Sequence, residues 1–193
     1  MQDDPQNPLH ATGLDHALLD AGASLLLIVD MQDKLLPAIH DTGALRERVS
    51  RLAQAARLLS VPVWATEHWP EKIGATHADL RPHVDRVVPK THFNACREAP
   101  FLRDWPAGRT RVLLTGTEAH ICVLQTGLGL AQAGFEPVLV TDGIGSRRPA
   151  DHAAACERWR RYGLETVTAE MAIYEWLETP AHPAFREVLV LVK

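Results

Sequence analysis

The sequence predicts an α/β fold in which one parallel sheet of six strands carries helices on both faces, for two reasons. Short apolar runs alternate along the chain with segments whose apolar residues recur at helical spacing. The first run, 24–30, is also apolar without a break until Asp30, which is typical of a strand buried on both faces. We therefore expect a doubly wound, Rossmann-like sheet with right-handed crossovers and a strand order of about 3-2-1-4-5-6.

The strands after the first are short runs rich in Val, Leu and Thr. They are expected at 61–66, 85–90, 111–116, 136–141 and 164–168. The fifth strand is expected to end at Thr141 and Asp142. Between the second and third runs, segment 67–84 scatters His, Pro and Gly without a period, which indicates an irregular loop.

Helices are expected between and after these strands. The expected positions are 43–59, 97–104, the segment from Cys122 to Gly134, a segment from about Pro149, 169–178 and 183–192. Apolar residues three and four positions apart support the first of them. Pro149 suits the first turn of a helix, and Gly134 suits the residue that follows a helix end.

The length of 193 residues fits one domain. Residues 1–22 are expected to form a loose N-terminal arm, because the start of the chain is polar and contains Pro5 and Pro8. Residues 23–193 are expected to form the single domain, since no linker or repeat interrupts them.

Composition excludes several classes of protein. The formal net charge is -4 and no basic stripe is present, which argues against nucleic acid as a partner. No apolar run approaches the ~20 residues that cross a membrane, and the N-terminus does not resemble a secretory signal. Three widely spaced cysteines argue against a disulfide framework and favour a reducing, cytoplasmic location.

Polar residues follow the predicted strands at the edge where open α/β sheets bind ligands. Asp30 ends the first strand, Lys90 ends the third, and Cys122 lies where the fourth strand leads into a helix. A helix N-terminus and a nearby ammonium group would lower the pKa of the thiol, and a carboxylate could accept its proton. If the three converge, they predict nucleophilic acyl transfer. The alternatives are a buried small side chain for Cys122, a strand-end cap for Asp30 and a solvated surface position for Lys90.

Three motifs give the sequence a family resemblance. The stretches "LLLIVDMQ", "VVPKTHF" and "TGTEAHICVLQT", each at a strand end, resemble the isochorismatase-like cysteine hydrolases from about residue 23 onward. The tail "EWLETPAHPAFREVLVL" is similar to small isochorismatase-domain hydrolases whose substrate is unassigned. The resemblance implies a catalytic triad of Asp30, Lys90 and Cys122, and a homo-oligomer, commonly a dimer or a multiple of it.

The resemblance also implies a non-proline cis peptide bond between Thr117 and Glu118. It would direct the backbone N–H groups of Glu118 and Cys122 at an oxyanion. The nicotinamidase branch of the family binds a metal through an Asp-x-His pattern and a further His nearby. Here Glu67 and His68 are adjacent and His77 is distant, so we expect no metal, no other cofactor and a substrate other than nicotinamide.

Several residues near the strand ends are candidates for a substrate pocket. His68, Trp69 and Phe93 could form its wall, although aromatic packing in a surface loop explains them nearly as well. His120 could be a general base or an ordinary residue in a first helical turn. Arg147 could bind an anionic substrate or face water.

The leading interpretation is a cysteine hydrolase of a small molecule that cleaves a C–N amide-type bond. Cys122 would form a covalent acyl-enzyme, Asp30 would act as acid and base, and Lys90 would lower the pKa of the thiol. One alternative on the same fold is a redox-sensing thiol protein, and another is a non-catalytic interaction protein.

Overall fold

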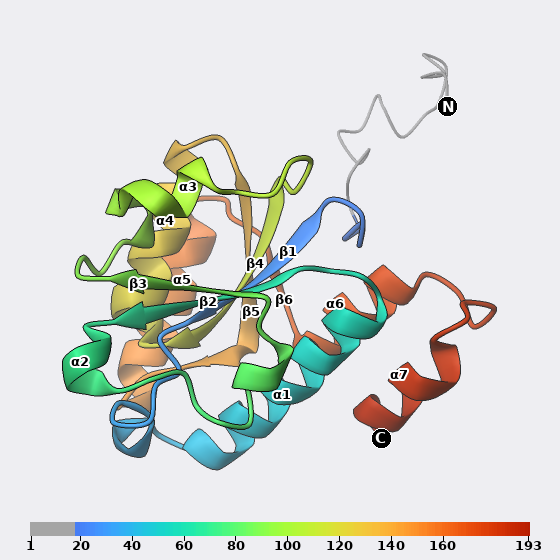
Figure 1. Cartoon of the computed structure of the whole chain (residues 1–193), viewed down its shortest axis with the longest axis horizontal. Helices are drawn as coiled ribbons and strands as arrows, with labels where there is room; N and C mark the ends of the chain where they lie inside the picture. Colours follow the sequence, from blue (N-terminus) through green and yellow to red (C-terminus); the bar gives the residue numbers. More distant parts are fainter. Residues whose placement is uncertain (1–17) are drawn as a thin grey trace.

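A six-stranded parallel sheet forms the centre of the structure, a computed structural model that describes residues 18–193 (Figure 1). Its strands are β1 (Ser24–Val29), β2 (Val63–His68), β3 (Arg86–Lys90), β4 (Arg111–Thr117), β5 (Glu136–Gly145) and β6 (Thr166–Val167). Their spatial order is β3-β2-β1-β4-β5-β6, and every neighbouring pair is parallel. The predicted fold class and strand order are confirmed.

Helices cover both faces of this sheet. They are α1 (Thr42–Leu58), α2 (Pro70–Ile73), α3 (Ala99–Arg103), α4 (Leu124–Gln132), α5 (Pro149–Arg161), α6 (Ala169–Leu177) and α7 (Phe185–Val192). One face packs against α1, α6 and α7, and the opposite face packs against α3, α4 and α5 (Figure 1). Short 3-10 turns lie at Leu36–Ala38, Arg81–His83 and Ala95–Arg97.

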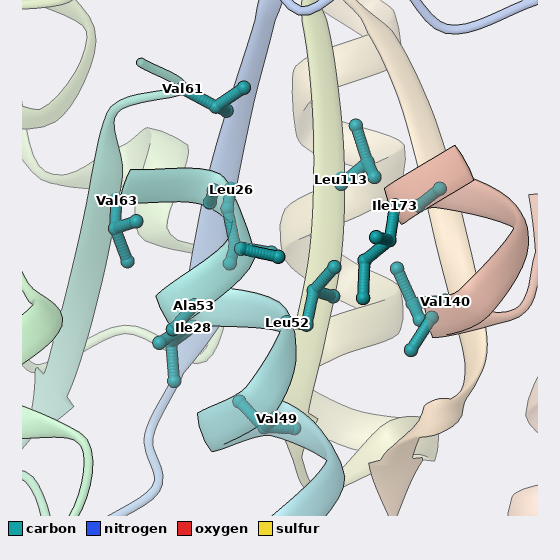
Figure 2. Packing of buried hydrophobic residues seen from close by; sticks show 14 of the residues in the cluster. Leu26, Ile28, Val49, Leu52, Ala53, Val61, Val63, Leu113, Val140 and Ile173 are labelled. Carbon is teal, nitrogen blue, oxygen red and sulfur yellow. The ribbon is translucent and has the colours of Figure 1, made fainter. Parts of the chain in front are cut away.

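The central strand β1 supplies side chains to both cores. Leu26 and Ile28 point to the α1 side, where Figure 2 shows them with Val49 and Leu52 of α1. Leu25, Leu27 and Val29 alternate with them and point to the α4 side. All six residues of β1 are buried because helices cover both faces, which explains the uninterrupted apolar run.

Two predicted elements differ from the structure. The fifth strand does not end at Thr141 and Asp142 but runs to Gly145. The β4–β5 register shifts after the pair Leu114–Leu139, β5 carries the extra residues, and pairing resumes at Gly116–Ile144. Segment 67–84 is not wholly irregular: its first two residues complete β2, and it contains α2 and a 3-10 turn.

The start of the predicted helix at Cys122 also differs. A π-helical turn, Ala119–Val123, carries this residue, and α4 begins only at Leu124. π-helical turns are rare and are frequent at functional sites. The expected roles of Pro149 and Gly134 are confirmed, since Pro149 opens α5 and Gly134 follows α4 with a φ of 87°.

Most of the expected N-terminal arm, residues 1–17, lies outside the described residues. Leu19 is buried, and its backbone N–H donates to a Glu175 carboxylate oxygen at 2.9 Å. We propose that residues 23–193 form one domain, against which residues 18–22 pack. Over the described residues, no helix is both long enough and apolar enough to span a membrane.

Gly116 occupies the position where β4 passes closest to the end of β1. Its φ is 108°, and a Cβ atom there would lie 2.0 Å from the backbone oxygen of Val29. Gly134 has a similar φ of 87°, but no atom lies within 4 Å of the place that a Cβ atom would take there. Comparing alanine substitutions at Gly116 and Gly134 therefore separates the cost of a positive φ from the cost of a steric collision.

We predict that Gly116→Ala lowers the free energy of unfolding by about 3 kcal/mol or more, because the new methyl group collides with backbone that cannot yield. Gly134→Ala is the matched control and should cost only about 1 kcal/mol, the strain of a positive φ. Urea denaturation of both variants measures the difference. Equal losses would contradict the close approach of β4 to β1.

Candidate active site

Asp30 lies directly after β1 with its side chain fully buried. Its φ is 48°, a conformation that costs a residue with a side chain roughly 1–2 kcal/mol. Neighbouring strands hold it there: Thr66 donates its hydroxyl to Asp30 Oδ1 at 2.7 Å, and Thr117 donates to the Asp30 carbonyl at 2.7 Å. The backbone N–H of Asp30 donates to the Thr66 carbonyl at 3.1 Å. The carboxylate is thus held by Thr66 of β2, and the backbone of Asp30 is held from both sides of β1.

Lys90, the last residue of β3, reaches across β2 to this carboxylate. Its Nζ lies 2.7 Å from Asp30 Oδ2, and both side chains have 0% exposure. Nζ also donates to the carbonyl of His92 at 3.2 Å. The contact between Lys90 Nζ and Asp30 Oδ2 is an ion pair, but its geometry is not that of a hydrogen bond. Among the described residues, Oδ2 has no hydrogen-bond donor. This oxygen therefore retains a lone pair that can accept a proton.

Cys122 completes the group from the π-helical turn before α4 and is only 6% exposed. Its thiol interacts with both Asp30 and Lys90. Burial, followed by the negative charge of Asp30, raises the pKa of Cys122 to about 12, while Lys90 lowers it by less. The predicted low thiol pKa is therefore wrong. The resting group is a neutral thiol beside a paired carboxylate.

The other two cysteines show what distinguishes this site. Cys96, Cys122 and Cys156 are all free. Burial raises the pKa of Cys96 to about 12 as well, and it also raises the pKa of Cys156. Neither Asp30 nor Lys90 contributes to those two shifts. Cys122 differs from Cys96 by the ion pair beside it, and the pKa alone would not identify it.

The loop between β4 and the π-helical turn contains a cis peptide bond, Thr117–Glu118. The Glu118 side chain is mostly buried, and its Oε2 accepts hydrogen bonds from the backbone N–H of Arg147 at 3.2 Å and from its Nε at 2.9 Å. Arg147 is 57% exposed but is engaged by this ion pair. The use of the Glu118 and Cys122 N–H groups as oxyanion donors stays a prediction.

The candidate pocket residues fall into two groups. His68 and Phe93 lie together, with ring centroids 5.3 Å apart, and Trp69 follows His68 with Lys72 Nζ 4.0 Å above its ring. Phe93 and Trp69 are exposed. His120 has other partners: its Nδ1 lies 3.0 Å from Ser146 Oγ, and its Nε2 lies 3.9 Å from Asp151.

Two supporting residues were given no role in the site by the sequence. Thr66 was recognised only as a strand end, although it holds the catalytic candidate Asp30. Gln32, two residues after Asp30, is fully buried, and its side-chain oxygen and nitrogen bind the backbone of His68 at 2.7 Å and 3.1 Å. One signal in the sequence could have identified Thr66 and Gln32 as supporting residues. Both are polar and lie at or just after an apolar strand run.

Glu67 and His77, which lie where the sequence was compared with the metal site of the nicotinamidase branch, have other partners. Glu67 accepts hydrogen bonds from the N–H and hydroxyl of Thr76 at 2.7 Å and 2.8 Å, and His77 lies 3.1 Å from Arg46. Within residues 18–193, no three His, Cys, Asp or Glu side chains gather as metal ligands would. These residues therefore do not fit the metal of the nicotinamidase branch.

A cavity of about 380 Å³ lies near the carboxyl end of β5, away from these groups. Its lining includes His40, Arg48, Asp142, Ser146 and His152, and none of Asp30, Lys90 or Cys122. Its size suits a small ligand. The chemically competent groups nevertheless lie at the ends of β1, β3 and β4.

Comparisons of this chain with protein families, with related sequences and with solved structures agree with one another. The sequence pattern that defines the isochorismatase domain matches residues 24–171. Isochorismatase domain-containing protein 2A of Mus musculus is 33% identical over 174 residues, which cover 89% of this chain and 83% of the mouse protein.

Solved structures share the fold. The structure described as the MAR1 ribonuclease from Caenorhabditis elegans has a TM-score of 0.85 at 30% identity and covers 91% of this chain and 92% of its own. YcaC from Pseudomonas aeruginosa, with hexane-2,5-diol and covalent acrylamide, has a TM-score of 0.84 at 22% identity, covering 91% and 92%. The Escherichia coli YcaC product, described as an octameric hydrolase of unknown specificity, has a TM-score of 0.79 at 21% identity, covering 91% and 96%.

We predict that the protein loses stability as pH rises from about 9 to about 12. In the unfolded chain, Cys122 and Cys96 ionise near their ordinary pKa of 9.0, whereas the folded chain keeps both thiols protonated up to about 12. The folded state thus binds more protons over this window, so the free energy of unfolding must fall with rising pH.

Urea denaturation at several pH values from 8 to 11 measures this loss. Cys122→Ala and Cys96→Ala should each flatten the decline relative to the wild type. A Cys122→Ala profile parallel to that of the wild type would show that the folded thiol has an ordinary pKa.

Proposed function

Because this chain belongs to the isochorismatase domain family, we propose that it hydrolyses a C–N amide-type bond of a small molecule through a covalent acyl-enzyme on Cys122. The observation that supports this most is the Cys122 thiol in contact with the fully buried ion pair of Asp30 and Lys90. A nucleophile, a proton acceptor and a fixed positive charge are the three groups that such a reaction needs.

In the acylation step, Asp30 accepts the thiol proton as the Cys122 sulfur attacks the carbonyl carbon. The raised pKa of Cys122 means that proton transfer accompanies the attack and does not precede it. Lys90 stabilises the negative charge that develops on sulfur. Protonated Asp30 then gives its proton to the departing nitrogen, the C–N bond breaks, and a thioester remains on Cys122.

The backbone N–H groups of Glu118 and Cys122 are the proposed donors to the carbonyl oxygen as it becomes negative. The ion pair of Glu118 with Arg147 supports this role, because it anchors the loop that contains the Glu118 N–H. Arg147 is thereby a supporting residue, and its charge is not free for an anionic substrate.

In the deacylation step, Asp30 accepts a proton from water while the water oxygen attacks the thioester carbonyl. The tetrahedral intermediate then releases the acid, and sulfur recovers the proton from Asp30 as it leaves. The cycle returns the neutral thiol and the Asp30–Lys90 ion pair. His68, Trp69 and Phe93 are proposed as pocket wall, and His120 as a structural residue held by Ser146.

The Caenorhabditis elegans neighbour is described as a ribonuclease, but the charges of this chain favour a small molecule. Binding a phosphate backbone requires unpaired positive charges. At this site Lys90 is paired with Asp30 and Arg147 with Glu118. Redox sensing is also disfavoured, because sensor thiols are accessible and have low pKa values, whereas Cys122 is buried with a raised pKa.

We also propose that the protein self-associates. The Escherichia coli YcaC product is described as octameric, and in this chain the contacting helices α6 and α7 expose Met171, Tyr174 and Val190 at 48%, 42% and 75%. Contiguous exposed apolar side chains favour an interface. Trp176 and Leu177 of α6 are buried within the chain and are not part of this surface. Three unpaired cysteines favour a reducing compartment such as the cytoplasm.

We predict that the wild type turns over at least one compound in a screen of amides, ureides and enol ethers, with an RNA oligonucleotide included as the competing substrate. Cys122→Ala should abolish turnover, since no nucleophile remains. Cys96→Ala, the same change at a cysteine with an equally raised pKa, should leave the rate within about twofold of the wild type. RNA cleavage that survives in Cys122→Ala, with no amide turnover, would contradict the proposal.

A further inference from the structure

We infer that His68 binds the substrate through its Nδ1 atom, which accepts a hydrogen bond from the carboxamide N–H and so selects uncharged amides that carry a free N–H group. The inference rests on the proposed amide hydrolysis and adds a specificity-determining residue to it.

The sheet register places His68 beside the triad. His68 of β2 and Lys90 of β3 are register partners, so their side chains lie on the same face of the sheet. Thr66, two residues before His68 and on that same face, holds Asp30 Oδ1. The residues Trp64 and Val88 continue this face into the core cluster that contains Cys122. The imidazole therefore lies on the same face of the sheet as the thiol and the Asp30–Lys90 pair.

The backbone of His68 is held by hydrogen bonds, but the Nδ1 atom of its ring has no partner among the described residues. Gln32 binds both the backbone N–H and the carbonyl of His68, and the ring lies against Phe93 at an interplanar angle of 31°. Nδ1 is buried and has no hydrogen-bond partner among the described residues. A buried polar atom left unpaired costs about 1–3 kcal/mol. A ligand that supplies the missing hydrogen bond would recover this cost.

The charges around His68 decide which ligand fits. Burial, followed by the positive charge of Lys90, lowers the pKa of His68, so the ring is neutral at pH 7. Asp30 and Glu98 oppose this shift only in part. Because Asp30 neutralises Lys90, a neutral imidazole adds no charge beside this ion pair. An uncharged substrate therefore fits better than an ion.

The proposed chemistry decides which part of the amide meets Nδ1. The carbonyl oxygen is assigned to the backbone N–H groups of Glu118 and Cys122, which leaves the amide N–H without an acceptor. A neutral imidazole protonated at Nε2 offers Nδ1 as that acceptor. The bond would hold the amide plane in position while sulfur attacks.

Acrylamide and N,N-dimethylacrylamide test this inference, because both alkylate thiols and only the first has amide N–H groups. The measurement is the rate of adduct formation on Cys122, located by peptide mass spectrometry, with each reagent scaled to its rate on free cysteine. The wild type should prefer acrylamide. His68→Phe, which keeps a flat ring but removes the acceptor, should reduce that preference about tenfold. His68→Asn places an amide oxygen near the Nδ1 position and should retain it within about threefold.

The controls separate this inference from the function on which it rests. Urea denaturation establishes that both His68 variants are folded, and Cys96 reports any general change in reactivity. If Cys122 reacts faster than Cys96 in every variant but the preference for acrylamide is the same in all three proteins, the role of His68 is wrong and the hydrolase proposal stands. The role is equally wrong if His68→Asn loses the preference as His68→Phe does. If Cys122 in the wild type reacts no faster than Cys96, the proposed nucleophile is wrong, and the inference falls with it.

Discussion

The ion pair between Asp30 and Lys90 is the interaction on which the geometry of the site depends. Each charge loses several kcal/mol of hydration when it is buried, and only close pairing with further polar contacts offsets that cost. The Asp30 carboxylate accepts such a contact from the Thr66 hydroxyl, the Lys90 ammonium group donates to the carbonyl of His92, and Thr117 holds the backbone carbonyl of Asp30. These residues belong to β2, β4 and the segment after β3, so the pair can form only when the strands are ordered as observed. Folding of the sheet and assembly of the site are therefore one event.

The Asp30–Lys90 ion pair also influences whether the Cys122 thiol is protonated. A thiol beside Lys90 alone would be expected to ionise easily, but Asp30 neutralises Lys90 and burial disfavours a thiolate. In the proposed reaction the proton consequently stays on Cys122 until a substrate carbonyl is present to receive the sulfur. Cys96 has an equally raised pKa but lacks the ion pair that could accept and return its proton. The proposed reaction therefore needs Asp30, Lys90 and Cys122 together.

The sequence predicts the positions of Asp30, Lys90 and Cys122 because strand ends are readable from apolar runs, and parallel strands bring those ends to one edge. It does not predict the extension of β5 to Gly145, which depends on a shift in the register between β5 and β4. Nor does it predict the sign of the Cys122 pKa shift, because that sign depends on burial and on which of two opposite charges dominates. The unpaired Nδ1 of His68 is similarly invisible in the sequence, since it is defined by what surrounds it in space.

A double-mutant cycle on the buried pair tests most directly whether it holds the site together. Asp30→Asn leaves a buried ammonium group, Lys90→Met leaves a buried carboxylate, and the double variant leaves neither. Urea denaturation at pH 7 should show a loss of about 3–5 kcal/mol for each single variant, because an uncompensated charge stays buried. The double variant should be more stable than the sum of the two losses predicts, by about 2 kcal/mol or more. Additive losses would mean that the two side chains contribute independently, and the ion pair could not then be the constraint that organises the site.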